Sequence, residues 1–410
     1  MLVPWHVFNQ YWILEVGTLL WILVTLGSYG LILTIRFLIL LKMRVLELYS
    51  GIGGMHFAFQ KSTVKHEVVA AVEINDVATD VYKYNFPNTL TLNRVIESFS
   101  ADFVCSLNTN VWSLCPPCQP FTRLGKRMCE ADNRSSSFFH VLNLISILKP
   151  AGIILENVKG FEHSEPWRQL IEVLNSCDYE YRQFLLSPLQ FGIPNCRLRF
   201  YLLARLRSSS WNSSFKMGKS ESIELRPPID APILPGCQCA FCSGVISHIQ
   251  RTDDNFAEYI QFCRPISEFL LVPNDNTKDL YFLDEKCLQR YFRVLDIVRS
   301  CDKKTRCFTK GYSKRIEGTG SVIQTSMENE TSEKINNYYE ANKEDEQAVL
   351  QYAKLLKLRF FHSREVANMM CFPKSFDFPE RITEKQRLRL LGNSVNVLVV
   401  SHLIYWAFGT

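Results

Sequence analysis

The sequence lacks a strong excess of charge of either sign. Its formal net charge is +5, which permits an anionic partner without requiring one, so any basic surface must be local. It also lacks an internal repeat and the regular cysteine spacing of a small disulfide-rich domain. The 14 cysteines are scattered over 410 residues, which favours reduced thiols in the cytosol or nucleus. With 47% hydrophobic and 21% charged residues, the chain is predicted to fold, as one large domain or two ordinary ones.

Residues 16–35 lack charge altogether. A run of about 20 such residues can span a bilayer, and the basic residues after it would place the rest of the chain on the cytosolic side. A signal peptide fits less well, because a basic start and a small-residue cleavage site are missing. Three interpretations of residues 1–42 stay open: an extension outside the working protein, a membrane anchor, or a soluble packing helix. The first is favoured, with Met43 as the natural start, because a central strand would follow the span almost at once.

Short runs with strand character alternate with helical segments between Arg44 and about Leu206. These runs read RVLELYS, EVVAAVEI, NVWSLC, GIILENV and RFYLLARL. The alternation predicts a parallel α/β sheet with crossover helices. Residues 43–206 and 380–410 are assigned to this domain, and the turn-rich residues 207–379 to a smaller one. Within the smaller domain, the polar segment 326–347 is predicted to be a mobile loop that runs into a helix.

A glycine-rich turn follows the first predicted strand in ELYSGIGGMHFAF. Gly51, Gly53 and Gly54 would let the backbone approach a ligand closely at the start of a helix. Glu73 ends the second predicted strand, where a carboxylate can accept hydrogen bonds from both ribose hydroxyls. The spacing differs from the usual dinucleotide fingerprint, so a nucleoside ligand without a pyrophosphate fits better. A purely structural glycine turn is the alternative.

The segment WSLCPPCQPFTRLGK places Cys118 in a loop that prolines make stiff. A thiol held there, at the end of a strand, is well placed to act as a nucleophile once a neighbouring group lowers its pKa. Two other interpretations stay open. One is a buried structural cysteine, and the other is a redox site, because Cys115 and Cys118 form a C-x-x-C pair.

Further polar side chains follow two other predicted strands. Glu156 and Asn157 come directly after an apolar strand, where α/β enzymes carry their chemistry. A carboxylate there is poorly solvated, so its pKa is expected to be raised. Arg197 and Arg199 stand at alternate positions near the start of a later strand and should face one side. A cysteine, a glutamate and two arginines around one cleft suit addition to an electron-poor ring better than disulfide exchange.

The motifs resemble those of one enzyme superfamily. SGIGG, PPCQPFT, ENVKGFE, NCRLRFYL and LGNSVNV occur in the order of the DNA cytosine-5 methyltransferases. ELYSGIGGMH, VYKYNFP, CFTKGY, IEGTGSV and RLLGNSVNV resemble more closely the branch that methylates cytosine 38 of tRNA-Asp. The resemblance runs from Met43 almost to the C-terminus. It implies an α/β, Rossmann-like catalytic domain with a smaller inserted target-recognition domain, and S-adenosylmethionine as the methyl donor.

The resemblance also assigns roles to residues. Cys118 is the catalytic thiolate that adds to carbon 6 of the cytosine, which makes carbon 5 nucleophilic, and the base must leave its stack for this. Glu156 would hold N3 and the amino group of the base, while Arg199 binds its O2 side and Arg197 supports the loop or the backbone. The implied cofactor-binding residues are Tyr49, Ser50, Gly51, Gly53 and Gly54 around the methionine part, Glu73 on the ribose, Ile74 on the adenine ring, Glu97 near the adenine amino group, and Asn393, Ser394 and Val395 closing the pocket.

A basic and aromatic segment is the predicted substrate-binding element. TRCFTKGYSKRIEGTG interleaves lysine and arginine with aromatic residues, as suits phosphate contact and stacking on RNA. A solvated loop is the alternative. The predicted substrate-binding residues are Arg306, Phe308, Thr309, Lys310 and Tyr312.

Two positions depart from the pattern of the family. Asn110 replaces an aspartate just before the catalytic loop, which is expected to weaken a contact on the cofactor side. Cys115 replaces a serine, and it opens a route to oxidative inactivation through a Cys115–Cys118 bond.

Three cysteines stand close together in GCQCAFC, at positions 237, 239 and 242. Their spacing is not a common zinc-finger pattern, so an irregular cysteine-rich loop without a metal is predicted. A zinc site completed by His248 or Cys263 is the alternative.

The sequence therefore predicts an S-adenosylmethionine-dependent enzyme that methylates carbon 5 of cytosine in tRNA. We expect it in the cytoplasm and the nucleus, or anchored on the cytosolic side of a membrane if residues 16–35 are genuine. DNA methylation is the runner-up, with DNA as a weaker substrate, and it is disfavoured by the resemblance and by the lack of chromatin-binding modules. A catalytically idle RNA-binding protein is the third interpretation.

Overall fold

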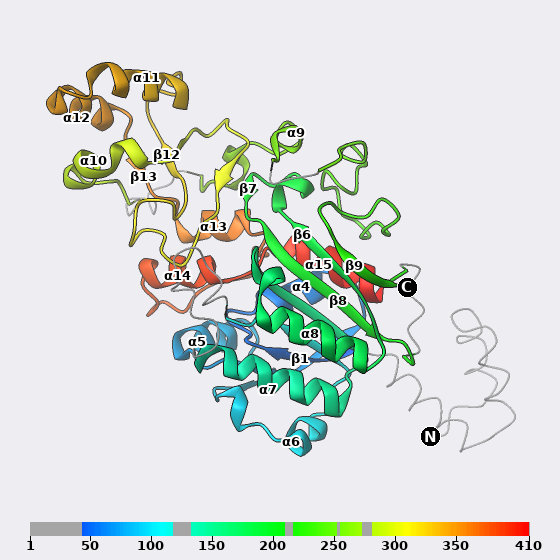
Figure 1. The fold of residues 1–410 in the computed structure, drawn as a ribbon. Coiled ribbons are helices and arrows are strands. Elements are labelled where there is room, and N and C mark those ends of the chain that lie inside the picture. The colour runs from blue at the N-terminus through cyan, green and yellow to red at the C-terminus, as the bar shows by residue number, and fades with distance from the viewer. Residues whose placement is uncertain (1–42, 118–132, 210–215, 252–254, 273–280, 410) are drawn as a thin grey trace, which may run out of the picture.

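A large mixed sheet forms the centre of the protein (Figure 1). The structure is a computed structural model that describes residues 43–117, 133–209, 216–251, 255–272 and 281–409. Within these ranges the sheet has eight strands in the order β3-β2-β1-β4-β5-β8-β6-β9. The strands are β1 (Met43–Leu48), β2 (His66–Val72), β3 (Leu90–Leu92), β4 (Val111–Leu114), β5 (Gly152–Val158), β6 (Tyr179–Leu186), β8 (Arg199–Leu206) and β9 (Lys219–Glu224). β1 lies between β2 and β4, in the interior of the sheet as predicted.

The sheet is not wholly parallel, and the prediction was wrong on this point. Strands β1 to β5 pair in parallel, but β8 runs antiparallel to both β5 and β6. Residues 187–198, which join β6 to β8, contain only a 3-10 turn and the short strand β7 (Asn195–Cys196). Because no helix crosses over the sheet there, the chain turns back on itself and the strands pair antiparallel.

Helices cover both faces of this sheet (Figure 1). Successive side chains of a strand point to opposite faces, so Val45 packs with α4, α5 and α15, whereas Leu46 and Leu48 pack with α6, α7 and α8. The result is the three-layer arrangement of Rossmann-like folds. The helices are α4 (Gly54–Lys61), α5 (Asp76–Asn85), α6 (Ala101–Ser106), α7 (Asn133–Leu148), α8 (Glu165–Ser176) and α15 (Val397–Phe408).

The predicted smaller domain contributes to both parts of the molecule. β9 lies beyond Leu206, where the first catalytic segment was expected to end, and it pairs with β6 as the edge strand of the large sheet. The rest includes a three-stranded sheet in the order β10-β12-β13 with its own apolar core. The elements of this part are β10 (Ile297–Val298), β11 (Thr305–Arg306), β12 (Val322–Gln324), β13 (Leu358–Arg359), α9 (Ala257–Ile260), α10 (Glu285–Tyr291), α11 (Ser332–Asn342), α12 (Glu346–Leu355) and α13 (Ser363–Met369). The helix α14 (Glu384–Asn393) lies in the segment 380–410 that was assigned to the catalytic domain.

The segment 326–347, predicted to be a mobile loop that runs into a helix, contains the whole of α11, which forms a helical hairpin with α12. Thr331 caps α11 by accepting a hydrogen bond from the backbone N–H of Lys334. Ile335 is buried, and the Tyr338 ring stacks on Tyr352 of α12 with centroids 3.9 Å apart. The predicted helix is present, and a few apolar side chains anchor it although its other residues are polar.

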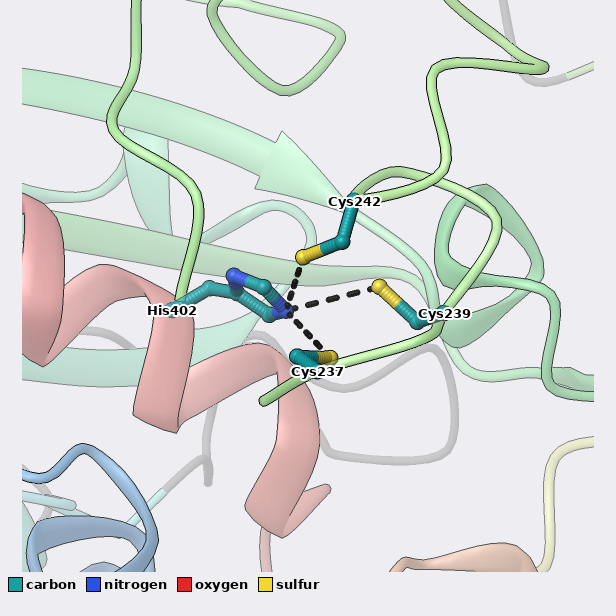
Figure 2. A group of neighbouring side chains, drawn as sticks. All are labelled: Cys237, Cys239, Cys242 and His402. Carbon is teal, nitrogen blue, oxygen red and sulfur yellow. Dashed lines mark hydrogen bonds between the residues drawn. The ribbon is translucent and has the colours of Figure 1, made fainter. Parts of the chain in front are cut away.

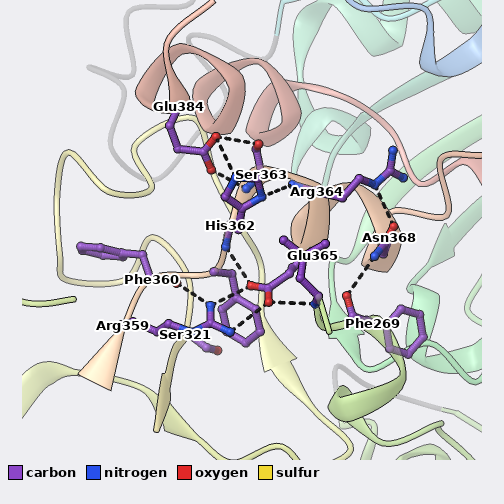
Figure 3. A network of polar contacts seen from close by, with 12 residues as sticks. Phe269, Ser321, Arg359, Phe360, His362, Ser363, Arg364, Glu365, Asn368 and Glu384 are labelled. Carbon is purple, nitrogen blue, oxygen red and sulfur yellow. Dashed lines mark hydrogen bonds and ion pairs between the residues drawn. The ribbon is translucent and has the colours of Figure 1, made fainter. Parts of the chain in front are cut away.

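A buried ion pair joins the small sheet to α13 (Figure 3). Arg359 donates two hydrogen bonds to Glu365, at 2.8 and 2.9 Å, and the Glu365 side chain is completely buried. The same carboxylate accepts hydrogen bonds from the backbone N–H groups of His362 and Leu271. One side chain thus fixes β13, the start of α13 and the segment before residue 272 relative to one another.

Among the described residues, one helical stretch, Glu384–Phe408, is long enough and contains a window apolar enough to cross a membrane. It comprises α14, α15 and the turn between them. Its apolar window is 83% buried inside the protein, as expected for a core helix. The predicted span 16–35 lies outside the described residues.

Candidate active site

A cavity of about 270 Å³ opens where the parallel strands β1, β2, β4 and β5 end. Ligand sites of α/β sheets lie at this edge. Most of the predicted site residues line it, together with the segment that joins α14 to α15. The lining comprises Tyr49, Ser50, Gly51, Ile52, Gly54, Met55, Glu73, Ile74, Asn75, Ala78, Cys115, Pro116, Pro117, Glu156, Asn157, Val158, Arg197, Arg199, Leu390, Gly392, Asn393, Ser394 and Val395.

The glycine turn forms one wall of this cavity. Gly51 and Gly53 have φ of +55° and +83°, a conformation that side chains with a Cβ rarely adopt. A Cβ on Gly54 would lie 2.7 Å from Ser394 Oγ, so the start of α4 touches the turn before α15 only because glycine is there. Gly53 shapes this turn but does not line the cavity itself.

Two groups in this wall have unused hydrogen-bonding capacity. The hydroxyl of Ser50 is buried and has no partner among the described residues. Glu73 accepts hydrogen bonds from the backbone N–H groups of Gly51 and Asn75, at 2.9 and 2.8 Å, and a carboxylate can accept more. Ile74 follows it with 62% of its side chain exposed. The carboxylate of Glu73 can accept hydrogen bonds from ribose hydroxyls, and the exposed side chain of Ile74 can pack on a base, so this wall suits a nucleoside.

Glu97 lies outside the lining of the cavity. It is exposed on a 3-10 turn and accepts a hydrogen bond from the Ser136 hydroxyl at 2.8 Å. The neighbouring Ser137 accepts a hydrogen bond from the hydroxyl of Tyr49 at 3.1 Å, and Tyr49 does line the cavity. The predicted contact between Glu97 and a ligand stays a prediction.

Glu156 and Arg199 form the opposite end of the cavity. Glu156 lies near the carboxyl end of β5, and its Oε1 lies 3.3 Å from Nε of Arg199 at the start of β8. Burial raises the pKa of Glu156, while the positive charges of Arg199 and Arg197 oppose that shift. The carboxyl group therefore holds a proton more readily than an exposed glutamate, as the sequence predicted.

Arg197 is buried, and its side chain contacts the basic segment, the end of α14 and the turn before α15. Its guanidinium donates to the carbonyl oxygens of Phe308, at 3.0 Å, and Gly392, at 3.2 Å, and also to that of Ser394. The side chain is 3% exposed, and burial lowers the pKa of Arg197. The expectation that Arg197 supports the backbone agrees with these contacts.

The predicted substrate-binding segment docks beside the cavity through β11, which pairs with β7. Gly392 approaches this segment so closely that a Cβ there would lie 2.3 Å from the Thr309 carbonyl. Arg306 and Lys310 are exposed, and Thr309 is partly buried. Arg306 also forms an ion pair with Asp296 at 3.0 Å.

Phe308 and Tyr312 do not fit the predicted role of stacking on RNA. Both side chains are buried, at 1% and 2% exposure, and their rings pack edge to face with centroids 4.9 Å apart. The Tyr312 hydroxyl donates to the Ser321 carbonyl oxygen at 2.7 Å and accepts from the backbone N–H of Phe361 at 2.9 Å. These rings therefore form the core of the segment, and its exposed basic residues remain for contact with a ligand.

Cys307 is a neighbour of the site that the sequence did not reveal. Its Sγ lies 3.5 Å from Arg197 Nη1 and 3.7 Å from Arg199 Nη2. Burial alone would raise the pKa of this thiol, but the two guanidinium groups outweigh burial and lower it. The only signal in the sequence is its position beside Phe308, 110 residues from Arg197.

The departures from the family pattern fall in two different places. Asn110 lies at the amino end of β4, away from the cavity, and its side chain accepts a hydrogen bond from the backbone N–H of Arg44 at 2.8 Å. The expected effect on a cofactor-side contact is therefore wrong. Cys115 does line the cavity, and burial, followed by the charge of Glu156, raises its pKa. Cys118, and with it the Cys115–Cys118 bond, lies outside the described residues.

Comparison with known proteins agrees with this geometry. The model of the C-5 cytosine-specific DNA methylases matches residues 43–406. A Homo sapiens protein named tRNA (cytosine(38)-C(5))-methyltransferase is 38% identical over 394 residues, which covers 88% of this chain and 98% of the relative. A Dictyostelium discoideum protein named DNA (cytosine-5)-methyltransferase is 34% identical, with 88% and 93% covered.

The structural comparison leads to the same family. The crystal structure of a Spodoptera frugiperda DNMT2 mutant superposes with a TM-score of 0.71 at 36% identity, covering 89% of this chain and 99% of that one. The predicted Rossmann-like fold and the predicted family are thereby confirmed. With its glycine turn, its buried glutamate–arginine pair and this match over nearly all described residues, the chain belongs to the C-5 cytosine-specific DNA methylase family.

Proposed function

We propose that the protein transfers a methyl group from S-adenosylmethionine to carbon 5 of cytosine in tRNA, at cytosine 38 of tRNA-Asp. The observation that supports this most strongly is the shared cavity. It places a nucleoside-type wall at one end and the Glu156–Arg199 pair at the other. The choice of tRNA rests on the relatives that carry that substrate in their names.

The wall around Glu73 suits the cofactor. S-adenosylmethionine supplies an electrophilic methyl group on a sulfonium centre. Glu73, already oriented by two backbone N–H groups, would accept hydrogen bonds from the ribose hydroxyls. Ile74 would pack on the adenine ring, and the unpartnered hydroxyl of Ser50 would bind a polar group of the methionine part.

The other end suits a cytosine ring. The Cys118 thiolate would add to carbon 6, so that the carbon 5–carbon 6 electron pair becomes available at carbon 5. Carbon 5 would then attack the methyl carbon of S-adenosylmethionine, the bond from that carbon to sulfur would break with both electrons going to sulfur, and S-adenosylhomocysteine would leave. Loss of the carbon 5 proton to water would return electrons to the ring, re-form the double bond and expel the thiolate. Glu156, whose pKa burial raises, would donate a proton in a hydrogen bond to N3 and so stabilise the charge that develops on the ring.

Two tRNA transcripts, one DNA duplex and two protein variants test this proposal. The full chain is incubated with S-adenosylmethionine labelled in its methyl group and with tRNA-Asp, tRNA-Asp carrying uridine at position 38, or duplex DNA. We expect label in the first transcript only. Cys118→Ala should abolish labelling, whereas Cys105→Ala, at an exposed cysteine of α6, should preserve it.

The same assay separates the alternatives. Label confined to DNA would refute the tRNA substrate and favour the activity named for the Dictyostelium discoideum relative. Label in neither nucleic acid would refute the enzymatic proposal. Full labelling by Cys118→Ala would refute the assigned nucleophile.

A further inference from the structure

Four side chains of the kind that bind zinc converge (Figure 2), and none of them lines the active-site cavity. Cys237, Cys239 and Cys242 lie in the irregular segment between β9 and α9. His402 lies on α15, at least 160 residues further along the chain. The four ligand atoms all lie within 4.8 Å of one another, so the fold assembles a cluster that the cysteine spacing alone does not reveal.

The distances match a tetrahedral metal site. His402 Nε2 lies 3.6, 3.5 and 3.8 Å from the Sγ atoms of Cys237, Cys239 and Cys242. In a tetrahedron with Zn–S of about 2.3 Å and Zn–N of about 2.0–2.1 Å, sulfur and nitrogen are about 3.6 Å apart. Hydrogen bonding alone does not account for three thiols around one nitrogen, because a neutral imidazole nitrogen accepts through a single lone pair.

The histidine is buried in a setting that a metal bond would stabilise. His402 is 0% exposed, and its ring is surrounded by Phe191, Phe241 and Trp406, with centroids 5.1 to 5.9 Å away. Its Nδ1 has no hydrogen-bond partner among the described residues. Burying a polar ring among aromatic side chains is costly without a strong partner, and a metal at Nε2 would be that partner.

We propose that Cys237, Cys239, Cys242 and His402 bind one Zn²⁺ ion. The three thiols release their protons to solvent on binding and the imidazole binds as the neutral ring. Three thiolates exclude magnesium and calcium, which prefer oxygen ligands. The protein fills all four positions and leaves none open for water, so the site is structural.

The fourth ligand differs from both candidates named from the sequence. Cys263 is buried, and its thiol lies 3.5 Å from the carbonyl oxygens of Leu189 and Tyr259. His248 is exposed and packs its edge against Phe262. Neither belongs to the group of ligand atoms, whereas His402 does.

The ion would link the irregular segment between β9 and α9 to α15 of the large domain. α15 packs against α4, which opens with the glycine turn of the active site. Residues 225–256 contain no helix or strand among those described there, so local turns order their backbone. A metal bond to α15 would add to that order, because in structural sites the free energy of metal binding contributes to folding.

Metal analysis of the full chain tests this proposal without depending on methyl transfer. The protein is purified under reducing conditions, loaded with Zn²⁺, dialysed and analysed by elemental mass spectrometry. We expect one zinc per chain. Cys239→Ser and His402→Gln should lose nearly all of it, whereas Cys263→Ser, at a buried cysteine outside the cluster, should retain it.

A second measurement avoids the risk that a variant fails to fold. Wild-type protein loaded with Co²⁺ should show the sulfur-to-cobalt charge-transfer band and the intense visible bands of a tetrahedral site, and Zn²⁺ should abolish both. Removal of zinc by a chelator should lower the melting temperature, and added zinc should restore it. Three results would overturn the proposal. They are absence of bound zinc in the wild type, the spectrum of six-coordinate cobalt, and a disulfide among the three cysteines in protein purified under reducing conditions.

Discussion

Glu47 carries a buried carboxyl group on β1, a few residues before the glycine turn in the sequence. It is 1% exposed, and its Oε2 accepts a hydrogen bond from the Tyr82 hydroxyl at 2.9 Å, while Oε1 has no partner among the described residues. Burial raises the pKa of Glu47 to about 8, although the hydrogen bond from Tyr82 acts in the opposite direction. The group is therefore mostly protonated in the folded protein at neutral pH.

This shift predicts that Glu47→Gln stabilises the protein at neutral and alkaline pH. The folded-state pKa lies above the unfolded value, so the contribution of Glu47 to stability is complete below pH 4.5 and is lost as the pH rises to about 8. At 1.36 kcal/mol per pKa unit, the ionisable carboxyl costs about 3 kcal/mol at pH 7. The variant should thus resist urea more than the wild type at pH 7 and match it near pH 4.5.

The pH dependence of the stability of the wild type alone would not isolate the contribution of Glu47, because His56 also titrates. Burial lowers the pKa of His56 to about 3, so the stability that its neutral ring provides is present above pH 6.5 and is lost as the pH falls toward 3. Because both proteins contain His56, the difference between their urea midpoints isolates Glu47. A difference that does not change between pH 4.5 and pH 8 would contradict the prediction.

Single residues at strand ends could be predicted, but partners far apart in the sequence could not. Glu73 and Glu156 line the cavity because parallel strands present their carboxyl ends at one edge. Cys307 and His402 meet their neighbours only through the three-dimensional fold. The burial of Phe308 and Tyr312 was missed because an aromatic residue beside a lysine reads equally well as a core residue or as a platform for a base.

The Arg359–Glu365 pair is the clearest determinant of stability at the scale of elements, because it joins β13 to α13. Glu365→Gln would leave the Arg359 charge buried without a counterion. It would also place an amide donor among groups that donate hydrogen bonds. We expect a loss of about 3–5 kcal/mol, the usual cost of removing one partner from a buried pair, visible as a lower urea midpoint.

Two comparison variants sharpen this test. Glu340→Gln removes one partner of an exposed pair with Lys343 on α11 and its cap, and it should change stability by less than about 0.5 kcal/mol. The double variant Arg359→Met/Glu365→Leu should recover part of the loss, because an apolar pair needs no counterion. Equal effects of Glu365→Gln and Glu340→Gln would refute the role assigned to the buried pair.

The contact between α14 and the basic segment gives a prediction about substrate binding. A Cβ at Gly392 would meet the Thr309 backbone at 2.3 Å, so Gly392→Ala should displace residues 305–312. We expect a higher KM for tRNA than in the wild type. Cys105→Ala, at an exposed position of α6, serves as a control. Unchanged KM in Gly392→Ala would show that this docking does not position the RNA.

Element type was easier to predict than strand direction. Buried strands such as GIILENV read as continuous apolar runs, and all five predicted runs correspond to strands β1, β2, β4, β5 and β8. The direction of β8 depends on a connection without a crossover helix, which composition does not reveal. A helix was expected in segment 326–347, but the start of α11 could not be placed, because its polar surface hides a single buried isoleucine.

At the scale of the whole molecule, both the family match and the lining of the cavity begin after residue 42. Every residue that lines the cavity lies at Tyr49 or beyond, and the family match begins at Met43. Met43 opens β1, is 1% exposed and pairs with His66 of β2. These contacts depend on residues inside the matched range.

We therefore expect the protein that begins at Met43 to keep the kcat/KM of the full chain for methyl transfer to tRNA, and to melt at the same temperature. Both proteins are assayed side by side with labelled S-adenosylmethionine, and vesicle flotation is measured in parallel. Flotation of the full chain alone, at equal kcat/KM, would assign residues 16–35 to membrane binding, since about 20 uncharged residues suffice to span a bilayer. A tenfold loss of kcat/KM in the shortened protein, which corresponds to about 1.4 kcal/mol of transition-state stabilisation, would contradict the prediction and make residues 1–42 part of the working enzyme.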